Sequence, residues 1–420
     1  MRSIRVCMLV HNYYLRDPRV RKEAESLAAE GFSIDVVSLS EPGSHATREG
    51  SRQKTVNGVR IHVVRLAKKR GGGSRYLFEY LAMLGIGAWK ILRMHLKEPF
   101  DVVHIHNMPD FLVLAGLLPK LMGAKLVLDI HDPMPELYES MKRGKNDGWI
   151  LRAITWQEKW CCRLADRVVS VNETVRETLE RKGIDSGKIF ILHNYPDLGI
   201  FPLRTGSPPR RGRENPMTLL FAGTVTDQNN LAVAVRAVAV AIPEVPNLVL
   251  RILGDGNKAD EISKTARELG VADRIVFRPS VPADKVREEM GAADAGISPH
   301  RTGIFGDLCL STKILEYMTQ GLPVICSRTY TNERYVPGNA VFYFEPDDPV
   351  DMARQIIAVC RDTQAVVERT GAATKLVTRL SWAGERKRLV TFYRALVGAG
   401  PGARTARAAT PSMPNGERTS

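Results

Sequence analysis

Residues Ser311–Ile325 read STKILEYMTQGLPVI, a helix signal followed at once by a strand signal. Ser311 or Thr312 can cap the start of a helix, and Gly321 can end it. The apolar run Val324–Cys326 then predicts a short buried strand. A helix joined to a buried strand by a few residues is the repeating unit of an α/β protein.

The rest of the chain repeats this alternation in two halves. Strands of the first half are predicted at Arg5–Val10, Ser33–Ser38, Arg60–Leu66, Val102–His106, Lys125–Ile130, Val168–Val171 and Ile189–Leu192. Its helices are predicted at Val20–Glu30, Tyr76–Leu96, Phe111–Leu121, Leu151–Ala165 and Thr174–Lys182. In the second half, strands are predicted at Leu219–Ala222, Leu248–Leu253, Ile275–Arg278, Ala295–Ser298, Val324–Cys326 and Val341–Phe344. Because the strands are apolar, each half is expected to form a parallel sheet covered on both faces.

The domain organisation follows from one break in the pattern. Residues 203–216, LRTGSPPRRGRENP, have no apolar periodicity. We therefore expect a first doubly wound domain over 1–200, a linker over 201–216 and a second doubly wound domain over 217–381. A terminal helix at 382–398 is expected to cross back to the first domain, and 399–420 to be a disordered tail. Ligands of such domains bind beyond the carboxyl ends of the strands, which here face a cleft.

Composition excludes several classes of protein. Of 420 residues, 44% are apolar and 25% charged, which excludes disorder of the whole chain. Six scattered cysteines with no C-x-x-C pair argue against a disulfide framework or zinc site and fit a reducing cytoplasm. No stretch reaches the ~20 apolar residues of a spanning helix. The expected protein is soluble, or lies at the inner face of the cell membrane.

Basic residues are concentrated in one segment. The net charge is +14, and residues 51–100 hold eleven Lys and Arg against only Glu79 and Glu98. Such a block indicates an anionic partner, or only solubility. Nucleic acid is disfavoured because no recognisable binding fold accompanies the charge. A basic, aromatic helix instead fits docking on anionic lipid, or a core helix with solvated flanks. The residues of the membrane hypothesis are Lys68, Lys69, Arg70, Arg75 and Trp89.

Two motifs indicate a phosphate-bearing ligand. The strand Leu248–Leu253 runs into Gly254-Asp255-Gly256, where glycine lets a backbone approach a ligand or simply makes a tight turn. Free amides at the helix start near Ser311 suit a diphosphate, and Lys313 lies in that first turn. Glu316 follows one turn later and can accept two sugar hydroxyls; a surface Lys–Glu pair is the alternative.

The segment Ser311-x-Lys313-x-x-Glu316-Tyr317-Met318-x-x-Gly321-x-Pro323-Val324-Ile325 resembles the donor-binding signature of glycosyltransferase family 4. Further matching motifs, in the same order, cover some 330 residues: DPRV at 17–20, DVVHIHN at 101–107, DIHD at 129–132, Gly223-Thr224 and Gly254-Asp255-Gly256. The resemblance implies a GT-B fold, two Rossmann-like domains facing across a cleft, with the acceptor on the first and the nucleotide sugar on the second. It also implies transfer with retention of configuration.

The resemblance implies roles for single residues. Glu316 would bind the ribose, amides near Leu310–Lys313 the diphosphate, and His131 would point into the cleft near the transferred sugar. The family's first glutamate is absent, and Asp307 stands beside its position at Leu308. The catalytic candidates are therefore His131, Asp307, Lys313 and Glu316.

The donor loop after Gly223 lacks the family's usual cations, so Lys313 and Arg301 are expected to replace them. The donor-binding candidates are Gly223, Thr224, Gly254, Gly256, Arg301, Leu310, Ser311 and Thr312. The first loop lacks the family's Gly-Gly pair, which makes Arg19 a candidate phosphate or acceptor contact. The acceptor-side candidates are His11, Asn12, Arg19, His106 and Asp132.

The resemblance implies a glycosyltransferase that moves a sugar from a nucleotide diphosphate sugar to a glycan or lipid-linked acceptor, in exopolysaccharide or cell-envelope glycan synthesis. Helix amides and cations can stabilise the leaving diphosphate, so no metal and no cofactor are expected. The alternatives are another GT-B enzyme, either a sugar-nucleotide epimerase or a glycogen-synthase-like enzyme, or a catalytically silent scaffold.

Overall fold

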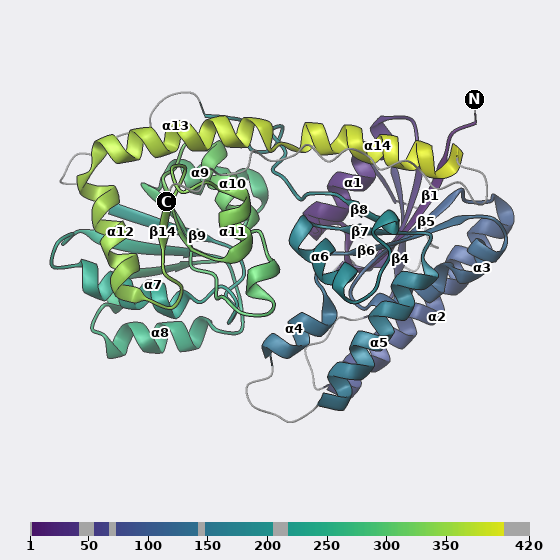
Figure 1. Cartoon of the computed structure of the whole chain (residues 1–420), viewed down its shortest axis with the longest axis horizontal. Coiled ribbons are helices and arrows are strands. Elements are labelled where there is room, and N and C mark those ends of the chain that lie inside the picture. The colour runs from purple at the N-terminus through teal and green to yellow at the C-terminus, as the bar shows by residue number, and fades with distance from the viewer. Residues whose placement is uncertain (1, 42–53, 67–72, 142–147, 205–216, 399–420) are drawn as a thin grey trace.

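A computed structural model describes residues 2–41, 54–66, 73–141, 148–204 and 217–398, without the side chains of 73–76 and 283–284. These residues form two α/β lobes, each built on its own sheet (Figure 1). The predicted α/β class with two doubly wound sheets is confirmed. The linker residues 205–216, the tail 399–420 and the basic residues Lys68, Lys69 and Arg70 lie outside the described residues.

The first lobe has an eight-stranded sheet in the order β3-β4-β2-β1-β5-β6-β7-β8, parallel except where β3 pairs with β4. Its strands are β1 (Arg5–Tyr13), β2 (Ser33–Leu39), β3 (Lys54–Val56), β4 (Val59–Val64), β5 (Val102–His106), β6 (Lys125–Ile130), β7 (Arg167–Ser170) and β8 (Ile189–Ile191). Its α-helices are α1 (Pro18–Ala29), α2 (Gly73–Lys97), α3 (Leu117–Leu121), α4 (Met134–Met141), α5 (Gly148–Leu164) and α6 (Glu173–Arg181). Short 3-10 segments are η1 (Tyr14–Arg16), η2 (Asp110–Gly116) and η3 (Ser186–Lys188).

The second lobe has a fully parallel six-stranded sheet in the order β11-β10-β9-β12-β13-β14. Its strands are β9 (Met217–Ala222), β10 (Leu248–Leu253), β11 (Ile275–Arg278), β12 (Ala295–Ser298), β13 (Val324–Ser327) and β14 (Phe342–Phe344). Its α-helices are α7 (Leu231–Ala241), α8 (Ala259–Glu268), α9 (Ala283–Gly291), α10 (Thr312–Thr319), α11 (Tyr330–Tyr335), α12 (Pro349–Arg361) and α13 (Thr363–Arg379). The 3-10 segments are η4 (Ala272–Arg274) and η5 (Gly306–Leu308).

Each sheet is covered on both faces, because its strands are apolar on both sides. In the first lobe one core includes Leu9, Val103 and Leu128, and the core on the other face includes Val6 and Val127. The strand order reverses between β1 and β5 in the first sheet and between β9 and β12 in the second. Loops diverge at such switch points and leave a crevice beyond the strand ends, which places the candidate site.

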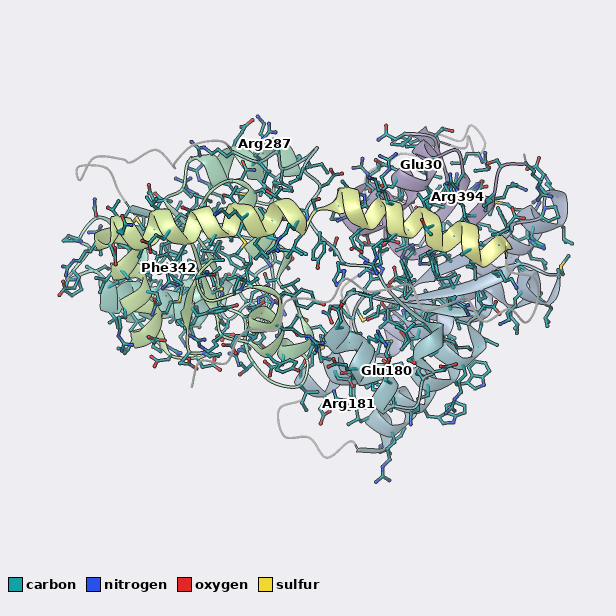
Figure 2. The ribbon with its side chains drawn as sticks, turned by 45° about the horizontal axis from the view of Figure 1, so that its top comes forward. Glu30, Glu180, Arg181, Arg287, Phe342 and Arg394 are labelled. Carbon is teal, nitrogen blue, oxygen red and sulfur yellow. The ribbon has the colours of Figure 1, made fainter. Side chains whose placement is uncertain are left out.

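The last helix, α14 (Trp382–Gly398), lies on the first lobe although it follows α13 of the second (Figure 1). Trp382, Leu389 and Tyr393 are buried in the first lobe's core, and the Trp382 indole donates to Ser26 Oγ at 2.9 Å. Figure 2 shows Arg394 and Glu30 on the side where α14 crosses this lobe. The chain therefore connects the lobes twice, which fixes one against the other.

Three segments of the first lobe differ from the prediction. The helix predicted at Phe111–Leu121 is mainly the 3-10 segment η2, followed by one α-helical turn, α3. Gly116 explains the tight packing, because a Cβ there would lie 2.4 Å from Leu126 Cδ1. The short helix α4 and the edge strand β3 were not predicted, since neither carries a clear apolar period.

Candidate active site

A cavity of about 280 Å³ lies between the two lobes. Arg19 of α1, together with His131 and Asp132 after β6, lines it from the first lobe, and Leu310 and Thr312 line it from the second. Its remaining lining residues are Pro133, Val171, Asn172, Val175, Asn194, Leu308 and Cys309. Residues predicted for the acceptor side and the donor side therefore line one cavity, beyond the strand ends.

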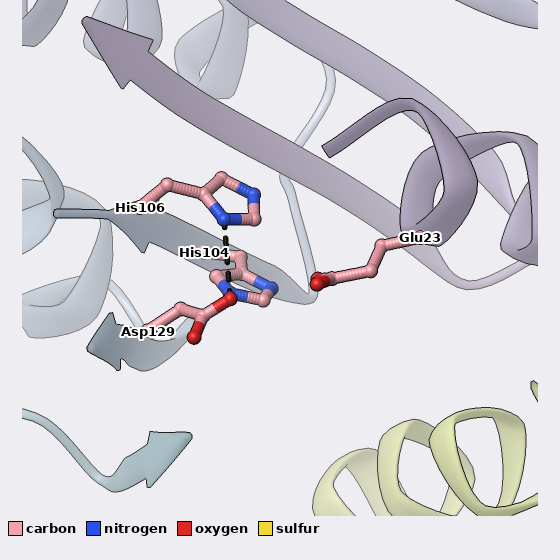
Figure 3. A group of neighbouring side chains, drawn as sticks. All are labelled: Glu23, His104, His106 and Asp129. Carbon is pink, nitrogen blue, oxygen red and sulfur yellow. Dashed lines mark ion pairs between the residues drawn. The ribbon is translucent and has the colours of Figure 1, made fainter. Parts of the chain in front are cut away.

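Asp129 organises the first-lobe side of this cavity (Figure 3). It is fully buried at the end of β6, where it lies opposite His106 of β5 in the sheet register. Arg19 Nη2 donates to its Oδ1 at 2.7 Å, while His131 Nε2 and His106 Nδ1 lie 3.1 and 3.2 Å from its Oδ2. His104 Nε2 lies 3.6 Å from the same oxygen. A single carboxylate thus faces one guanidinium and three imidazoles.

Asp129 stays ionised although it is buried. Burial alone would raise the pKa of this carboxyl, but Arg19 and His131 hold it well below its usual range. Burial and the neighbouring His104 lower the pKa of His106 to about 3, so its ring is neutral. The neutral His106 therefore donates through Nδ1–H to the carboxylate. An ionised Asp129 also selects the Nε2–H tautomer of His131, which leaves Nδ1 of that ring as an acceptor for a substrate hydroxyl.

The network reaches α14. The Tyr393 hydroxyl is hydrogen-bonded to His104 Nδ1, and the rings of His104 and His106 stack with centroids 4.3 Å apart. Tyr393 is fully buried. The crossing helix therefore supplies a hydroxyl that is hydrogen-bonded to His104 behind the cavity. A residue 289 positions away from its partner could not have been assigned from sequence.

Four buried side chains of this network, Glu23, His104, His106 and Asp129, place one potential metal-ligand atom each within 4.8 Å of one another (Figure 3). Arg19 already pairs with both carboxylates, at 3.1 Å from Glu23 Oε1 and 2.7 Å from Asp129 Oδ1. A divalent cation would have to share these oxygens with a buried guanidinium. The arrangement therefore fits an internal ion network better than a metal site.

The second-lobe side is built around the start of α10. Ser311 is the N-cap residue but makes no side-chain cap; its Oγ accepts from Ser298 Oγ at 2.9 Å. The Ser311 side chain therefore does not cap the first amides of the helix. These amides lie beside the cavity, which Leu310 and Thr312 line. Helix N-termini of this kind attract anions.

Lys313 lies against the loop that follows β9. Its Nζ is 3.4 Å from Asn229 Oδ1, and a Cβ added to Gly223 would lie 2.2 Å from its Cε. Gly223 is thus the residue that makes room for the lysine. Burial lowers the pKa of the Lys313 ammonium, while Glu316 on the next turn opposes that shift. Lys313 and Glu316 are both half-buried and interact electrostatically, so they are not a fully solvated surface pair.

Gly254 and Gly256 let two loops of the second lobe touch. A Cβ on Gly254 would lie 2.1 Å from the Gly223 carbonyl oxygen, and one on Gly256 would lie 2.0 Å from that of Val225. Gly254 also has a φ of +143°, which disfavours a side chain. The backbone of the predicted donor loop is therefore held by the second glycine motif.

Glu316 lies where the lobes meet. Burial raises the pKa of its carboxyl, and Lys313 and Lys22 of the first lobe oppose that shift. Lys22 Nζ donates to Asn194 Oδ1 and to the Tyr195 carbonyl, each at 2.7 Å. Burial lowers the pKa of Lys22 to about 8. Lys22 was not singled out from the sequence, because only the packing of the lobes brings it close to Glu316.

Asp307 and Arg301 lie to one side of the cavity. The Asp307 carboxylate accepts from the amides of Gly303 and Tyr330, at 3.0 and 3.1 Å, and faces a separate interlobe groove of about 1020 Å³. The Arg301 amide donates to the Gln228 carbonyl at 3.1 Å, and Gln228 Nε2 donates to the Arg301 carbonyl at 3.4 Å. The buried Nε of Arg301 finds no hydrogen-bond partner among the described residues. Asp307 thus has its carboxylate engaged in fixing this loop.

The remaining sequence candidates support the cavity without lining it. His11 packs edge-on against Tyr80, with ring centroids 4.9 Å apart. Asn12 Nδ2 donates to Asp17, the residue that caps α1. The Thr224 carbonyl accepts from Asn229 Nδ2 at 2.7 Å, and His106 is buried behind His131.

Sequence reasoning missed Asp129, Glu23, His104 and Lys22 as site residues. A signal did exist for two of them. Asp129 interrupts the apolar strand KLVLDI, and His104 and His106 alternate along β5, which puts both on one face of the strand. Charged or imidazole groups in a buried strand need partners, and those partners indicate a site.

Comparisons with known proteins identify the family of both lobes. Residues 17–195 match the family described as "Glycosyl transferase 4-like domain", and residues 216–362 match "Glycosyl transferases group 1". A D-inositol 3-phosphate glycosyltransferase from Thermomonospora curvata is 24% identical over 88% of both chains. A 2-deoxystreptamine glucosyltransferase from Streptomyces kanamyceticus is 22% identical over 67% of this chain and 74% of its own.

Solved structures are similar in fold. A sucrose-phosphate synthase from Thermosynechococcus elongatus superposes with a TM-score of 0.76 at 16% identity, covering 95% of this chain and all of that one. Anabaena HepE, solved in complex with UDP and glucose, gives a TM-score of 0.69 at 13% identity over 94% of this chain and all of its own. The expected GT-B fold is confirmed by this likeness.

Proposed function

The chain belongs to the glycosyltransferases that combine a 4-like domain with a group 1 domain, and from this premise we propose how its site works. The donor is a nucleoside diphosphate sugar bound by the second lobe, and the acceptor hydroxyl enters from the first lobe. The observation that carries this assignment is one cavity lined by His131 from β6 and by Thr312 from the start of α10.

The donor is held by three features of the second lobe. Amides at the start of α10 face the diphosphate, and the half-buried Lys313 adds positive charge next to the loop at Gly223. Glu316 lies one turn further along α10 and accepts the ribose hydroxyls. Anabaena HepE was solved with UDP-glucose, which supports a uridine nucleotide as the first donor to test.

The transfer step needs no nucleophile from the protein. The acceptor oxygen attacks C1 of the sugar from the face that the diphosphate leaves, so configuration is retained. The bond between C1 and the phosphate oxygen breaks, and the departing diphosphate takes the acceptor proton. Amides and Lys313 stabilise the growing charge without a metal ion. His131, fixed by Asp129, accepts a hydrogen bond from a hydroxyl of the transferred sugar.

The acceptor is a polyhydroxylated molecule, either part of a glycan or lipid-linked saccharide or a small cyclic polyol. The polyol is supported by the names of two relatives, which act on D-inositol 3-phosphate and on 2-deoxystreptamine. Arg19, the one Lys or Arg lining the described cavity, is already paired with Asp129 and Glu23. The cavity therefore favours an uncharged acceptor over a phosphorylated one.

Glu316→Gln tests the donor site. With the unmodified chain, UDP or a UDP-sugar is expected to raise the melting temperature. A UDP-sugar is then incubated with inositol, inositol phosphate, 2-deoxystreptamine or a saccharide, and an accepted substrate is detected by the release of UDP. The variant loses a charged ribose contact, so nucleotide affinity should fall about 10–100-fold. Glu345→Gln, an exposed carboxylate paired with Arg328, is the matched control.

The outcomes separate the proposed reaction from its alternatives. Release of an epimerised nucleotide sugar without any acceptor would assign an epimerase. No stabilisation by UDP, GDP or ADP sugars would assign a scaffold. Equal nucleotide binding by Glu316→Gln and Glu345→Gln would overturn the donor site.

A further inference from the structure

Three tryptophans of α5 point away from the protein. Trp149, Trp156 and Trp160 are 72%, 68% and 42% exposed, and the rings of Trp156 and Trp160 stack with centroids 6.5 Å apart. The exposed Arg152 and Arg163 lie on the same face of the helix as the tryptophans. Successive members of the series 149, 152, 156, 160 and 163 are three or four residues apart, which is about one helical turn. The outer side of α5 is thus a stripe of indoles and guanidinium groups.

A second stripe of the same kind runs along α2. Phe78, Leu81, Trp89 and Leu96 are each more than half exposed, and Arg93 lies over the Trp89 ring at 5.3 Å from its centroid. The opposite side of α2 is buried, as Met83 and Ile91 show. Exposed apolar side chains at helical spacing, interleaved with cations, form the second stripe.

Both stripes belong to one side of the first lobe. Helices α2 and α5 each pack on η2, and Figure 1 shows α2, α3 and α5 at the lower right of the first lobe. α3 and the residue after it add three exposed apolar side chains. These are Leu118, Leu121 and Met122. We call the exposed residues of α2, α3 and α5 the aromatic face.

The aromatic face has a single sign of charge. Within α5 and residues 77–97 of α2, the acidic residues are Glu79 and Glu158, and both are buried. The cations of the same segments are Lys90, Arg93, Lys97, Arg152, Lys159 and Arg163. Contiguous apolar surface of this kind is rare on a monomeric protein unless something covers it.

We propose that the aromatic face docks the enzyme on an anionic lipid bilayer. Indole rings favour the boundary between headgroups and acyl chains, and the interleaved Lys and Arg complement phosphate headgroups. Along α5 the three exposed indoles alternate with Arg152 and Arg163, and on α2 the exposed Trp89 lies beside Lys90 and Arg93. Within the described residues, no helix is long and apolar enough to cross a membrane.

Docking by α5 goes beyond the proposed sugar transfer and uses other residues. It also shifts the expected membrane contact. Lys68, Lys69 and Arg70 lie outside the described residues, and so does the side chain of Arg75, whereas Trp89 is on the aromatic face. α4, which follows the cavity residues His131 and Asp132, packs against α5. A docked enzyme would therefore hold its cavity near the bilayer.

The test is flotation of the full chain with vesicles of phosphatidylcholine alone or mixed equally with phosphatidylglycerol. The unmodified protein should float with the mixed vesicles, and less so in high salt because the charge is screened. A variant combining Trp149→Ala, Trp156→Ala and Trp160→Ala should bind about tenfold more weakly or worse. The control combines Val240→Ala, Val350→Ala and Val367→Ala, three exposed apolar residues of the second lobe.

Equal binding by the tryptophan variant and the valine control would overturn the proposal. So would a tryptophan-dependent dimer in light scattering, or a tryptophan-dependent protein complex, without vesicle binding. A single cooperative thermal melt close to that of the unmodified chain reports that each variant is folded. Flotation is measured without donor or acceptor. The result therefore tests the docking proposal independently of the proposed sugar transfer.

Discussion

The strongest prediction concerns Asp129→Asn, which keeps the shape of the side chain and removes its charge. Asp129 is fully buried and accepts from Arg19 at 2.7 Å, with His131 Nε2 at 3.1 Å and His106 Nδ1 at 3.2 Å. Removing one partner of a buried ion pair costs about 3–5 kcal/mol, because the other charge stays buried and uncompensated. The side-chain amide of the new asparagine would also place an N–H group beside the donors that now face the Asp129 carboxylate, such as Arg19.

That cost has a measurable size. At about 2–4 °C per kcal/mol for a domain of this length, the first lobe should melt about 6–20 °C lower. The control is Glu98→Gln, whose 74% exposed side chain pairs with Arg5 at 2.9 Å. Such a surface pair contributes about 0–1 kcal/mol, so the control should melt close to the unmodified protein. Calorimetry of both variants gives the comparison.

The pH dependence provides a second readout. The folded-state pKa of Asp129 is held well below that of the unfolded chain, chiefly by Arg19 acting against burial. Its contribution is therefore present above about pH 4 and is lost as pH falls through the folded pKa. The gap in melting temperature between Asp129→Asn and the unmodified chain should stay constant above about pH 5 and narrow in acid.

Activity should fall further than stability explains. With the carboxylate gone, the tautomer and orientation of His131 are no longer fixed, and misplacement of a positioning group can cost on the order of 100-fold. The assay is UDP release at a temperature where the variant is folded. If Asp129→Asn equals Glu98→Gln in both melting temperature and turnover, the carboxylate does not organise this site.

Two further predictions concern the connection between the lobes. Tyr393→Phe removes the hydroxyl that bonds His104 and should cost about 1–3 kcal/mol, while nucleotide binding to the second lobe is retained; unchanged calorimetry would contradict this. His193 is buried between Glu173 and Glu385, and these carboxylates raise its pKa against the effect of burial. Its stabilising charge is therefore present below about pH 6.5 and lost as pH rises through the folded pKa. His193→Gln should remove the fall in melting temperature between neutral and alkaline pH. If the variant shows the same fall as the unmodified chain, the charge on His193 does not stabilise the fold.

Local sequence patterns were sufficient to predict the class of fold and the order of its elements. Apolar runs alternating with amphipathic segments specify buried strands and covering helices, because both periods are set by backbone geometry within a few residues. The segment from Ser311 to Ile325 forms α10 and β13 as its capping residues and its glycine predict. The prediction failed at η2, where close packing on β6 replaces a regular helix.

The sequence predicted the α10 part of the site but not the network around Asp129. Lys313 and Glu316 are one turn apart on one helix, so their proximity follows from sequence. Asp129 receives donors from α1, from β5 and from the residues after its own strand, and α14 acts on it through His104. Such contacts depend on which strands become neighbours, and strand order is a property of the whole sheet.

The sequence by itself determined two α/β halves, a helix start at Thr312 and a basic, aromatic α2. Only the tertiary structure decided that Arg19 forms ion pairs with Asp129 and Glu23, and that Lys22 lies close enough to Glu316 to affect its pKa. It also decided that the tryptophans of α5 face outward beside α2. The physical reason is the range of the forces involved. Backbone geometry acts between neighbours in the chain, whereas burial and charge pairing act between neighbours in space.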